Sequence, residues 1–342
     1  MSTTPRVLLV ANPTAQSGRN AERIASARAL LDGAGLSHTL LPTLPGGGTI
    51  GAVRDALSRG EWSMVVAMGG DGTFSEVARG LYAAGRAEHI ALGMLPTGTA
   101  NDQGKSFGLS SDPAELARNV AVLAAGYETR LDAGRLTALD AAGAVVEEAL
   151  FFDSAGWGLS PRVLALRNED RRAIEQMPVV REVFRDHLVY AGALLRTFAE
   201  SYIEDDCFTA EVSTEGGVQR WEELTDLVVK GTRVYGGMWV FDPTSRHDDG
   251  LFEVVPFAGR MDWLSKGMVH LETTGALSTA LEEVGVTHSR GVRARSITLR
   301  FDTRPGALPL AAQIDGEEFP ATAQARIEVL PRALRLVVPA GA

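Results

Sequence analysis

Two short turns rich in glycine and small polar residues carry the first chemical signal in this sequence. The turn GGDGT at 69–73 follows the apolar run MVVAM at 64–68, and the turn PTGTAND at 96–102 follows ALGML at 91–95. Glycines placed directly after an apolar run let the backbone come close to a phosphate group. The first turn contains an aspartate and no lysine. Something other than a lysine in the turn must therefore neutralise a bound phosphate.

Asp71 and Asp102 stand at matching positions, just past the C-terminal ends of two predicted parallel strands. Ligands of open α/β sheets bind at that edge. We expect the two turns to face one cleft and to hold a nucleotide through backbone N–H groups and helix N-termini. Asp71 and Asp102 would then hold Mg²⁺ or its waters, and the metal would supply the missing positive charge. A single glycine-aspartate turn could merely connect two elements, but two such turns at matching positions favour a site.

Two further glycine motifs suggest other phosphate-binding devices. The segment GTANDQGKS at 98–106 resembles a Walker loop, but it has five residues where the loop needs four before Gly-Lys-Ser. The segment GGGTIG at 46–51 fits a dinucleotide-binding fingerprint with an acid, Asp71, twenty residues further on. It follows the second predicted strand instead of the first, directly after Pro45. A dinucleotide-binding oxidoreductase remains an alternative on this motif.

The elements that must position these turns alternate between strand and helix. Apolar runs at 7–11, 38–41, 64–68 and 91–95 predict buried strands, and helices are predicted at 21–31, at 50–58, after the 69–73 turn and from 113 onward. Asp112 to Glu115 has the form of a capping box with proline at the first helical position. Single helices between strands imply crossover connections, so we predict a doubly wound parallel α/β sheet.

The pattern changes near residue 127, where short alternating runs begin. They include 129–139, 144–152, 206–214, 225–234, 249–257, 295–302 and 326–339, and they read as antiparallel strands. We predict an α/β domain over 1–127 and a β-sandwich domain over 128–342, whose final segment can return to the first domain. A helical stripe at 183–199 can pack on the sandwich or contact lipid.

Composition limits the protein's surroundings and partners. The chain has 342 residues, a net charge of −10 and one cysteine, Cys207, and its longest apolar runs cannot span a bilayer. These features predict a soluble cytoplasmic protein without internal disulfides. The acidic balance argues against binding to nucleic acid or broad adhesion to anionic lipid. Any membrane contact is expected to be peripheral.

Five motifs in order resemble those of one enzyme family. They are NPTAQSG (12–18), GGDGT (69–73), LPTGTAND (95–102), HDDGLFEV (247–254) and QIDGEE (313–318). The chain resembles, over essentially its whole length, the bacterial diacylglycerol kinase and lipid kinase family, which is related to sphingosine and ceramide kinases. The resemblance implies an ATP-dependent, Mg²⁺-dependent phosphotransferase acting on a lipid hydroxyl. GGDGT alone is shared with NAD kinases, so NAD kinase is the nearer alternative.

The resemblance also implies roles for particular residues. ATP should contact the loop after the first strand, the end of the second, both glycine turns and the start of the helix after the first turn; the residues are Asn12, Pro13, Thr43, Gly69, Gly70, Asp71, Gly72, Thr73, Phe74, Ser75, Thr99, Asn101 and Asp102. Asp315 and Glu317 resemble the family's catalytic pair. We also expect Asp71 to take part in catalysis, through the metal ion that it would hold. Two acids two residues apart on an extended segment project to the same face. We assign Glu317 as the base and leave Asp315 as the other candidate.

The turn at 248–250 resembles the family's structural magnesium site. Asp249 would supply its side chain, and Arg246 and Leu251 would offer backbone carbonyls, which gives the oxygen shell that Mg²⁺ prefers. Ser75 stands where many lipid kinases have asparagine and should still reach a phosphate oxygen. Gln103, Lys105 and the Trp-Gly pair at 157–158 depart from the pattern and leave the lipid open. The resemblance also favours a homodimer.

Overall fold

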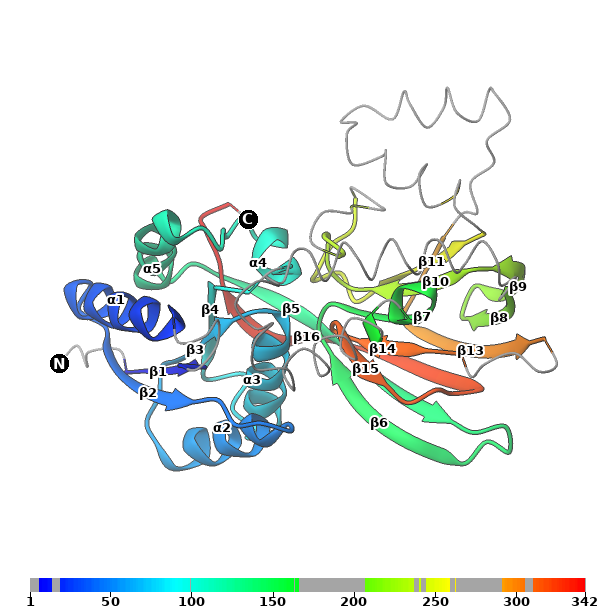
Figure 1. Ribbon diagram of the computed structural model, residues 1–342, viewed down its shortest axis with the longest axis horizontal. Helices are drawn as coiled ribbons and strands as arrows, with labels where there is room; N and C mark the ends of the chain where they lie inside the picture. Colours follow the sequence, from blue (N-terminus) through cyan, green and yellow to red (C-terminus); the bar gives the residue numbers. More distant parts are fainter. Residues whose placement is uncertain are drawn as a thin grey trace, which may run out of the picture.

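The protein divides into an α/β half and a β half (Figure 1). The computed structural model describes residues 6–13, 19–98, 100–162, 164–165, 207–236, 240, 244–258, 262, 291–304 and 310–341. The α/β half contains both glycine turns, and the β half contains the motifs at 247–254 and 313–318. The site predicted from the sequence therefore depends on how the two halves meet.

Four parallel strands form the centre of the α/β half. They are β1 (Arg6–Ala11), β2 (Ser37–Pro42), β3 (Met64–Gly69) and β4 (Ala91–Pro96), and they lie in the order β2-β1-β3-β4. The crossovers contain α1 (Arg19–Gly33), α2 (Gly48–Arg59) and α3 (Asp71–Ala83), and α5 (Leu116–Ala125) follows β4. The predicted α/β sheet is confirmed, and the GGGTIG motif follows β2, the edge strand.

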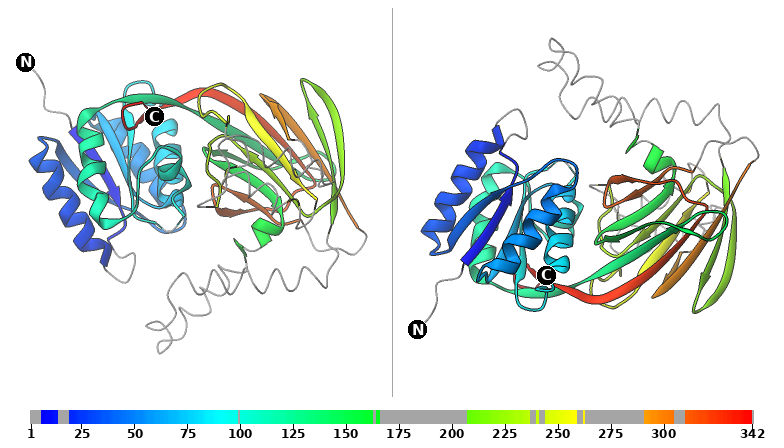
Figure 2. Two further views of the ribbon diagram at one scale, coloured as in Figure 1. Left: turned by 90° about the horizontal axis from the view of Figure 1, so that it is seen from above. Right: turned by 90° about the horizontal axis from the view of Figure 1, so that it is seen from below.

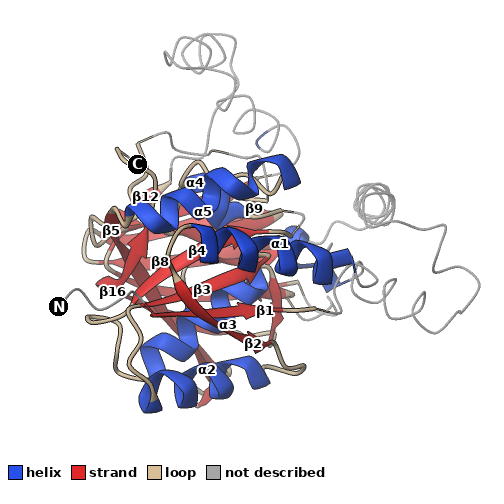
Figure 3. Cartoon of the chain, turned by 90° about the vertical axis from the view of Figure 1, so that its left-hand side faces the viewer, coloured by secondary structure: helices blue, strands red, loops and turns tan. Residues whose placement is uncertain are grey.

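Helices cover both faces of this sheet, as Figure 3 shows for α1 and α5 on one side and α2 on the other. Alternate residues of each strand point to opposite faces, so two separate cores form. Leu8 and Val10 of β1 pack with α2 and α3, whereas Val7 and Leu9 pack with α1 and α5. The continuous apolar runs in the sequence reflect this burial on both sides.

The β half is an antiparallel sandwich, as predicted. One layer is a six-stranded sheet in the order β12-β11-β10-β7-β14-β15, and the other is the antiparallel part of a ten-stranded sheet. Trp157 of β7 and Phe301 of β13, with ring centroids 5.3 Å apart, lie in the core between the layers. The strands are β5 (Glu128–Leu139), β6 (Val145–Phe151), β7 (Ser154–Gly158), β8 (Phe208–Thr214), β9 (Gly217–Leu224), β10 (Asp226–Lys230), β11 (Phe252–Phe257), β12 (Val292–Ala294), β13 (Ser296–Thr303), β14 (Ala312–Ile314), β15 (Glu317–Phe319) and β16 (Gln324–Val337).

Two long strands connect the halves (Figure 2). β16 pairs antiparallel with β5 along most of its length and reaches β4, where Leu336 pairs in parallel with Leu92. The ten-stranded sheet therefore runs from β2 through β4 and β16 into the sandwich. β5 begins at Glu128. The division into domains at residue 127 stays a prediction, since the sheet is continuous there.

Local details differ from the sequence expectations at three places. A short helix, α4 (Asp102–Ser106), begins directly at the second turn. Asp112 accepts the Ala114 N–H at 2.9 Å and opens a 3-10 turn, η2 (Pro113–Glu115), before α5 begins. The Glu115 side chain pairs with Arg118 and does not complete a capping box.

The helix predicted at 183–199 lies outside the described residues. No helix among the described residues is long and apolar enough to cross a bilayer.

Candidate functional site

The predicted nucleotide residues of the α/β half lie along one edge of the sheet. Asn12 and Thr43 directly follow β1 and β2, whose last residues pair with each other. Gly69 pairs with Pro96 at the ends of β3 and β4, so both glycine turns leave the sheet at this same edge. Thr99, as well as the segment 14–18 after Pro13, lies outside the described residues.

The two glycine turns pack backbone against backbone. Thr97 donates its N–H to the Gly69 carbonyl at 2.8 Å. A Cβ atom placed on Gly98 would lie 2.5 Å from the Gly70 Cα, and one placed on Gly70 would lie 3.2 Å from the Gly98 Cα. Only glycine at these positions permits this approach. The two turns therefore pack as one unit.

Asp71 is the first residue of α3, with Gly70 as its N-cap. One of its carboxylate oxygens accepts the Gln103 N–H at 3.2 Å, which ties the first turn to α4. Burial raises the pKa of Asp71, and the negative charge of Asp315 raises it further, against hydrogen bonds that lower it. A cation beside this carboxylate would be stabilised at neutral pH.

The other members of the two turns have structural contacts of their own. Asn101 has a left-handed backbone (φ 53°) and exchanges two hydrogen bonds with Gly98, at 3.0 and 2.6 Å. Asp102 accepts the N–H of Gly236, from the β half, at 2.7 Å. Thr73 packs against Gly69, and Phe74 is buried in the core. The side chains of Asn101 and Asp102 thus hold the turn and the junction together.

Ser75 points toward the β half. Its buried hydroxyl donates to a carboxylate oxygen of Asp315 at 2.6 Å. We expected this hydroxyl to reach a phosphate oxygen, but it donates its hydrogen bond to Asp315 in the other half.

Four carboxylates gather where the halves meet: Asp71, Asp102, Asp153 and Asp315. Burial raises the pKa of Asp153 well above its usual range, and the charges of Asp102, Asp315 and Asp71 raise it further. No group of three carboxylate, histidine or cysteine side chains among the described residues is arranged to hold a metal ion alone. Mg²⁺ usually takes one or two carboxylates together with substrate phosphates. The acids fit an ion that arrives with a nucleotide.

The segment 314–317 is a hairpin turn, so our expectation of an extended strand there was wrong. Ile314 pairs with Glu317, and the two loop residues, Asp315 and Gly316, have φ values of 49° and 77°. Positive φ at both positions is typical of a type I′ turn, for which Asp-Gly is a preferred sequence. The two acids consequently differ in their surroundings, because the turn separates them.

Asp315 is buried, and its oxygens are surrounded by donors. It accepts the backbone N–H groups of Phe152, Asp153 and Ser154 at 2.9–3.3 Å, in addition to the Ser75 hydroxyl. The guanidinium of Arg79 lies 3.8 Å away. This carboxylate joins β14 to the segment before β7 and to α3.

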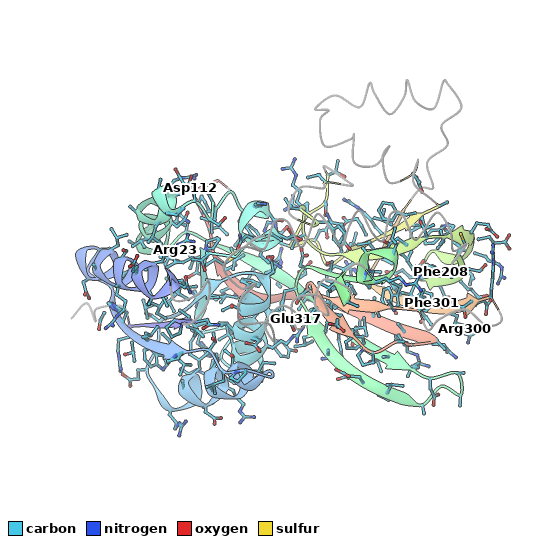
Figure 4. The ribbon with its side chains drawn as sticks, viewed as in Figure 1. Arg23, Asp112, Phe208, Arg300, Phe301 and Glu317 are labelled. Carbon is cyan, nitrogen blue, oxygen red and sulfur yellow. The ribbon has the colours of Figure 1, made fainter. Side chains whose placement is uncertain are left out.

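Glu317 is exposed and lies over the start of α3. Its Oε1 is 2.8 Å from the place where a Cβ on Gly72 would be. Figure 4 shows Glu317 at the junction of the two halves, beside α3. Although the residue is exposed, partial loss of solvent beside α3 raises the pKa of Glu317, whereas the charge of Arg79 lowers it. The acid from the far end of the sequence thus lies at the glycine turn.

The turn at 246–251 forms a second cluster of polar residues. Asp249 accepts the Leu251 N–H at 3.0 Å, and the Arg246 guanidinium pairs with Asp248 at 3.0 Å. Buried Asp132 of β5 accepts the N–H groups of Gly250 and Arg332, each at 2.6 Å. Burial raises the pKa of Asp132, and the charges of Asp249 and Asp248 add to this effect. No three acids of this turn, among the described residues, are arranged to hold a metal ion, so the magnesium site at Asp249, Arg246 and Leu251 stays a prediction.

Sequence reasoning missed three polar residues of these sites: Arg79, Asp132 and Asp153. Asp132 and Asp153 each interrupt an apolar strand pattern, which was an available signal. Asp153 is buried and accepts the Thr232 hydroxyl. Arg79 lies on α3 among other helix-forming residues, and nothing in its spacing distinguishes it from a solvated arginine.

Comparisons with known proteins agree with this architecture. A model of the diacylglycerol kinase catalytic domain matches residues 6–136. The chain is 31% identical over 292 residues to the "Probable lipid kinase YegS-like" of Pseudomonas aeruginosa, covering 84% of this chain and 80% of that protein. A protein of the same name from Pseudomonas putida is 29% identical over 290 residues, covering 84% and 81%.

Solved structures show the same fold. A diacylglycerol kinase structure from Bacillus anthracis superposes with a TM-score of 0.63 over 100% of both chains, at 18% sequence identity. That identity supports the fold alone, whereas the relatives and the domain model support the family. The chain therefore belongs to the lipid kinase family that is built on the diacylglycerol kinase catalytic domain.

Proposed function

We propose that this lipid kinase transfers the γ-phosphoryl group of ATP to the hydroxyl of a diacylglycerol-like or sphingoid lipid, with Glu317 as the general base. The observation that carries the proposal is the contact between the 314–317 hairpin and the start of α3, where Glu317 Oε1 lies 2.8 Å from the Cβ position of Gly72. Two motifs separated by more than 240 residues thereby share one surface. This contact supports a base that lies beside a nucleotide bound at the glycine turn.

The nucleotide would lie along the edge formed by Asn12, Thr43 and the two glycine turns. Backbone N–H groups at the start of α3 favour anionic groups because they point out of the helix. Bound Mg²⁺ would neutralise charge on the phosphates. Asp71 and Asp102 are the carboxylates that we propose to hold it, and Asp249 with the carbonyls of Arg246 and Leu251 would hold a separate structural ion.

Glu317 would take the proton of the lipid hydroxyl. The hydroxyl oxygen then forms a bond to the γ-phosphorus while the bond from that phosphorus to the bridging oxygen breaks, and ADP leaves. The raised pKa of Glu317 suits a base that must hold a proton briefly. Asp315 is a weaker candidate for this role, because its oxygens already accept three backbone N–H groups and a hydroxyl.

A screen with radiolabelled ATP tests the proposal. Purified protein is incubated with a total lipid extract and, separately, with NAD, and labelled products are identified by mass. We expect a labelled lipid that disappears with Glu317→Gln, by roughly 10²–10⁴-fold in turnover. Labelled NADP without labelled lipid would establish NAD kinase instead. Flotation with liposomes, with and without ATP, and light scattering test the predicted peripheral membrane contact and homodimer.

A further inference from the structure

Arg79 lies at the junction of the two halves, on the same face of α3 as Ser75 one turn before it. Its Nε donates to the carbonyl of Leu150 in β6 at 2.8 Å. Its Nη2 lies 3.8 Å from Asp315 Oδ2, and only 16% of the side chain is exposed. The guanidinium is therefore fixed in place by the β half.

The Nη2 group of Arg79 is buried and has no hydrogen-bond partner in the described part of the chain. A buried guanidinium N–H without a hydrogen bond is costly, because it has lost water and the charge of Asp315, 3.8 Å away, compensates only in part. Glu317 begins the strand that follows Asp315 and Gly316. The charge of Arg79 is the strongest influence that lowers the pKa of Glu317, against the loss of solvent that raises it.

We infer that Arg79 is a positioning residue for phosphoryl transfer: its guanidinium orients the Glu317 carboxylate over the start of α3. Nε holds the guanidinium on Leu150, and Nη2 is the donor that receives the carboxylate when the acceptor lipid excludes water. Asp315, 3.8 Å from the same donor and hydrogen-bonded to Ser75, keeps the hairpin in register with α3. This inference rests on the proposed function, because it assigns work to Glu317.

A double-mutant cycle separates this role from a structural one. Arg79→Gln should lower kcat by about 10²-fold, the effect of a displaced reacting group, with the KM for ATP nearly unchanged. In a Glu317→Gln background the same change should have almost no further effect, since the residue that Arg79 orients is gone. Arg79→Lys, which keeps the charge and loses the forked geometry, should lie between Arg79→Gln and the wild type.

Arg86→Gln is the matched control, because Arg86 also has a buried guanidinium atom without a hydrogen-bond partner in the described residues, beyond the other end of α3. It should leave kcat unchanged. Equal losses from Arg79→Gln with and without Glu317 would overturn the inference, as would wild-type kcat in Arg79→Gln. If Arg79→Gln does not fold, the same cycle is run with Arg79→Lys. Wild-type protein without lipid kinase activity would instead contradict the proposed function itself.

Discussion

The two carboxylates of the 314–317 hairpin differ in how their oxygens are used, and this difference predicts different consequences of mutation. Asp315→Asn replaces an acceptor of four hydrogen bonds by a group with two N–H donors that face other donors. We expect the free energy of unfolding to fall by about 1–3 kcal/mol, measured by urea denaturation.

Glu317→Gln is the matched change two residues away. It should leave the urea midpoint close to that of the wild type, because the side chain is exposed. Turnover should fall in both variants, but stability only in Asp315→Asn. The reverse order of stabilities would show that Glu317 is the structural acid and would remove our reason to prefer it as the base.

A buried acid at the start of β10 predicts a pH dependence of stability. Asp226 accepts the Ser160 N–H at 2.8 Å and the Ser160 hydroxyl at 3.2 Å, and burial raises its pKa to about 7. The unfolded chain releases this proton near pH 4, so the folded state binds more protons between pH 4 and 7. Stability from this group is therefore full below pH 4 and is lost as the pH rises to 7.

Asp226→Asn should remove this loss, which is about 1.4 kcal/mol for each pH unit between 5 and 7. Urea denaturation at pH 5 and pH 8 measures it as the difference between wild type and variant. Other acids with raised pKa, such as Asp71 and Asp153, contribute equally to both proteins and cancel. A variant that loses as much stability as the wild type over this range would contradict the assignment to Asp226.

Single residues also show how far the sequence could be interpreted. The motifs selected Asp71, Asp102 and Glu317, since glycine turns and the Asp-Gly-Glu segment mark positions where chemistry is common. They could not show that Ser75 donates to Asp315 or that Arg79 donates to Leu150, because these partners are 240 and 71 residues apart. Contacts across such separations follow from how the sheets pack, which one sequence does not specify.

The two glycine turns act as one element, and their close contact predicts which glycine is indispensable. Gly98→Ala places a methyl group 2.5 Å from the Gly70 Cα and 3.1 Å from the Gly70 N, and these backbone atoms cannot yield as the end of a flexible side chain can. We expect the turns to separate and nucleotide affinity to fall by about tenfold or more, measured by calorimetry with a non-hydrolysable ATP analogue.

Gly51→Ala is the control for this change, and it also tests the dinucleotide motif. Gly51 lies inside α2, and an added Cβ meets nothing within 4 Å. The variant should bind nucleotide normally and gain about 0.5–1 kcal/mol of stability, because alanine is the better helix former. Loss of binding in Gly51→Ala with normal binding in Gly98→Ala would place the nucleotide at GGGTIG instead.

Elements with regular patterns were predicted well, and short ones were not. The strands β1 to β4 are continuous apolar runs, and each expected range overlaps the observed one. β7, with the sequence SAGWG, and the three-residue strands β14 and β15 carry too few side chains for a period to appear. The hairpin at 315–316 was misread as extended, although Asp-Gly is a turn signal, and its strands are too short to show a period.

The continuous ten-stranded sheet predicts that the two halves of the molecule unfold together. β16 borders β4 at Leu336, which is fully buried in the core shared with α2 and α3, and the same strand pairs with β13 in the sandwich. Leu336→Ala should lower the free energy of unfolding by about 2–5 kcal/mol through the cavity that it leaves. Because β5 and β16 carry the change into both halves, β1–β4 and β8–β13 should lose hydrogen-exchange protection at the same, lower urea concentration.

Val218→Ala, at a side chain that is 66% exposed on β9, is the control and should change the unfolding of neither half. Earlier unfolding of β1–β4 alone in Leu336→Ala would show instead that the strands connecting the halves do not couple them. The position of Glu317 beside α3 would then depend on side-chain contacts between the halves, such as that of Ser75 with Asp315.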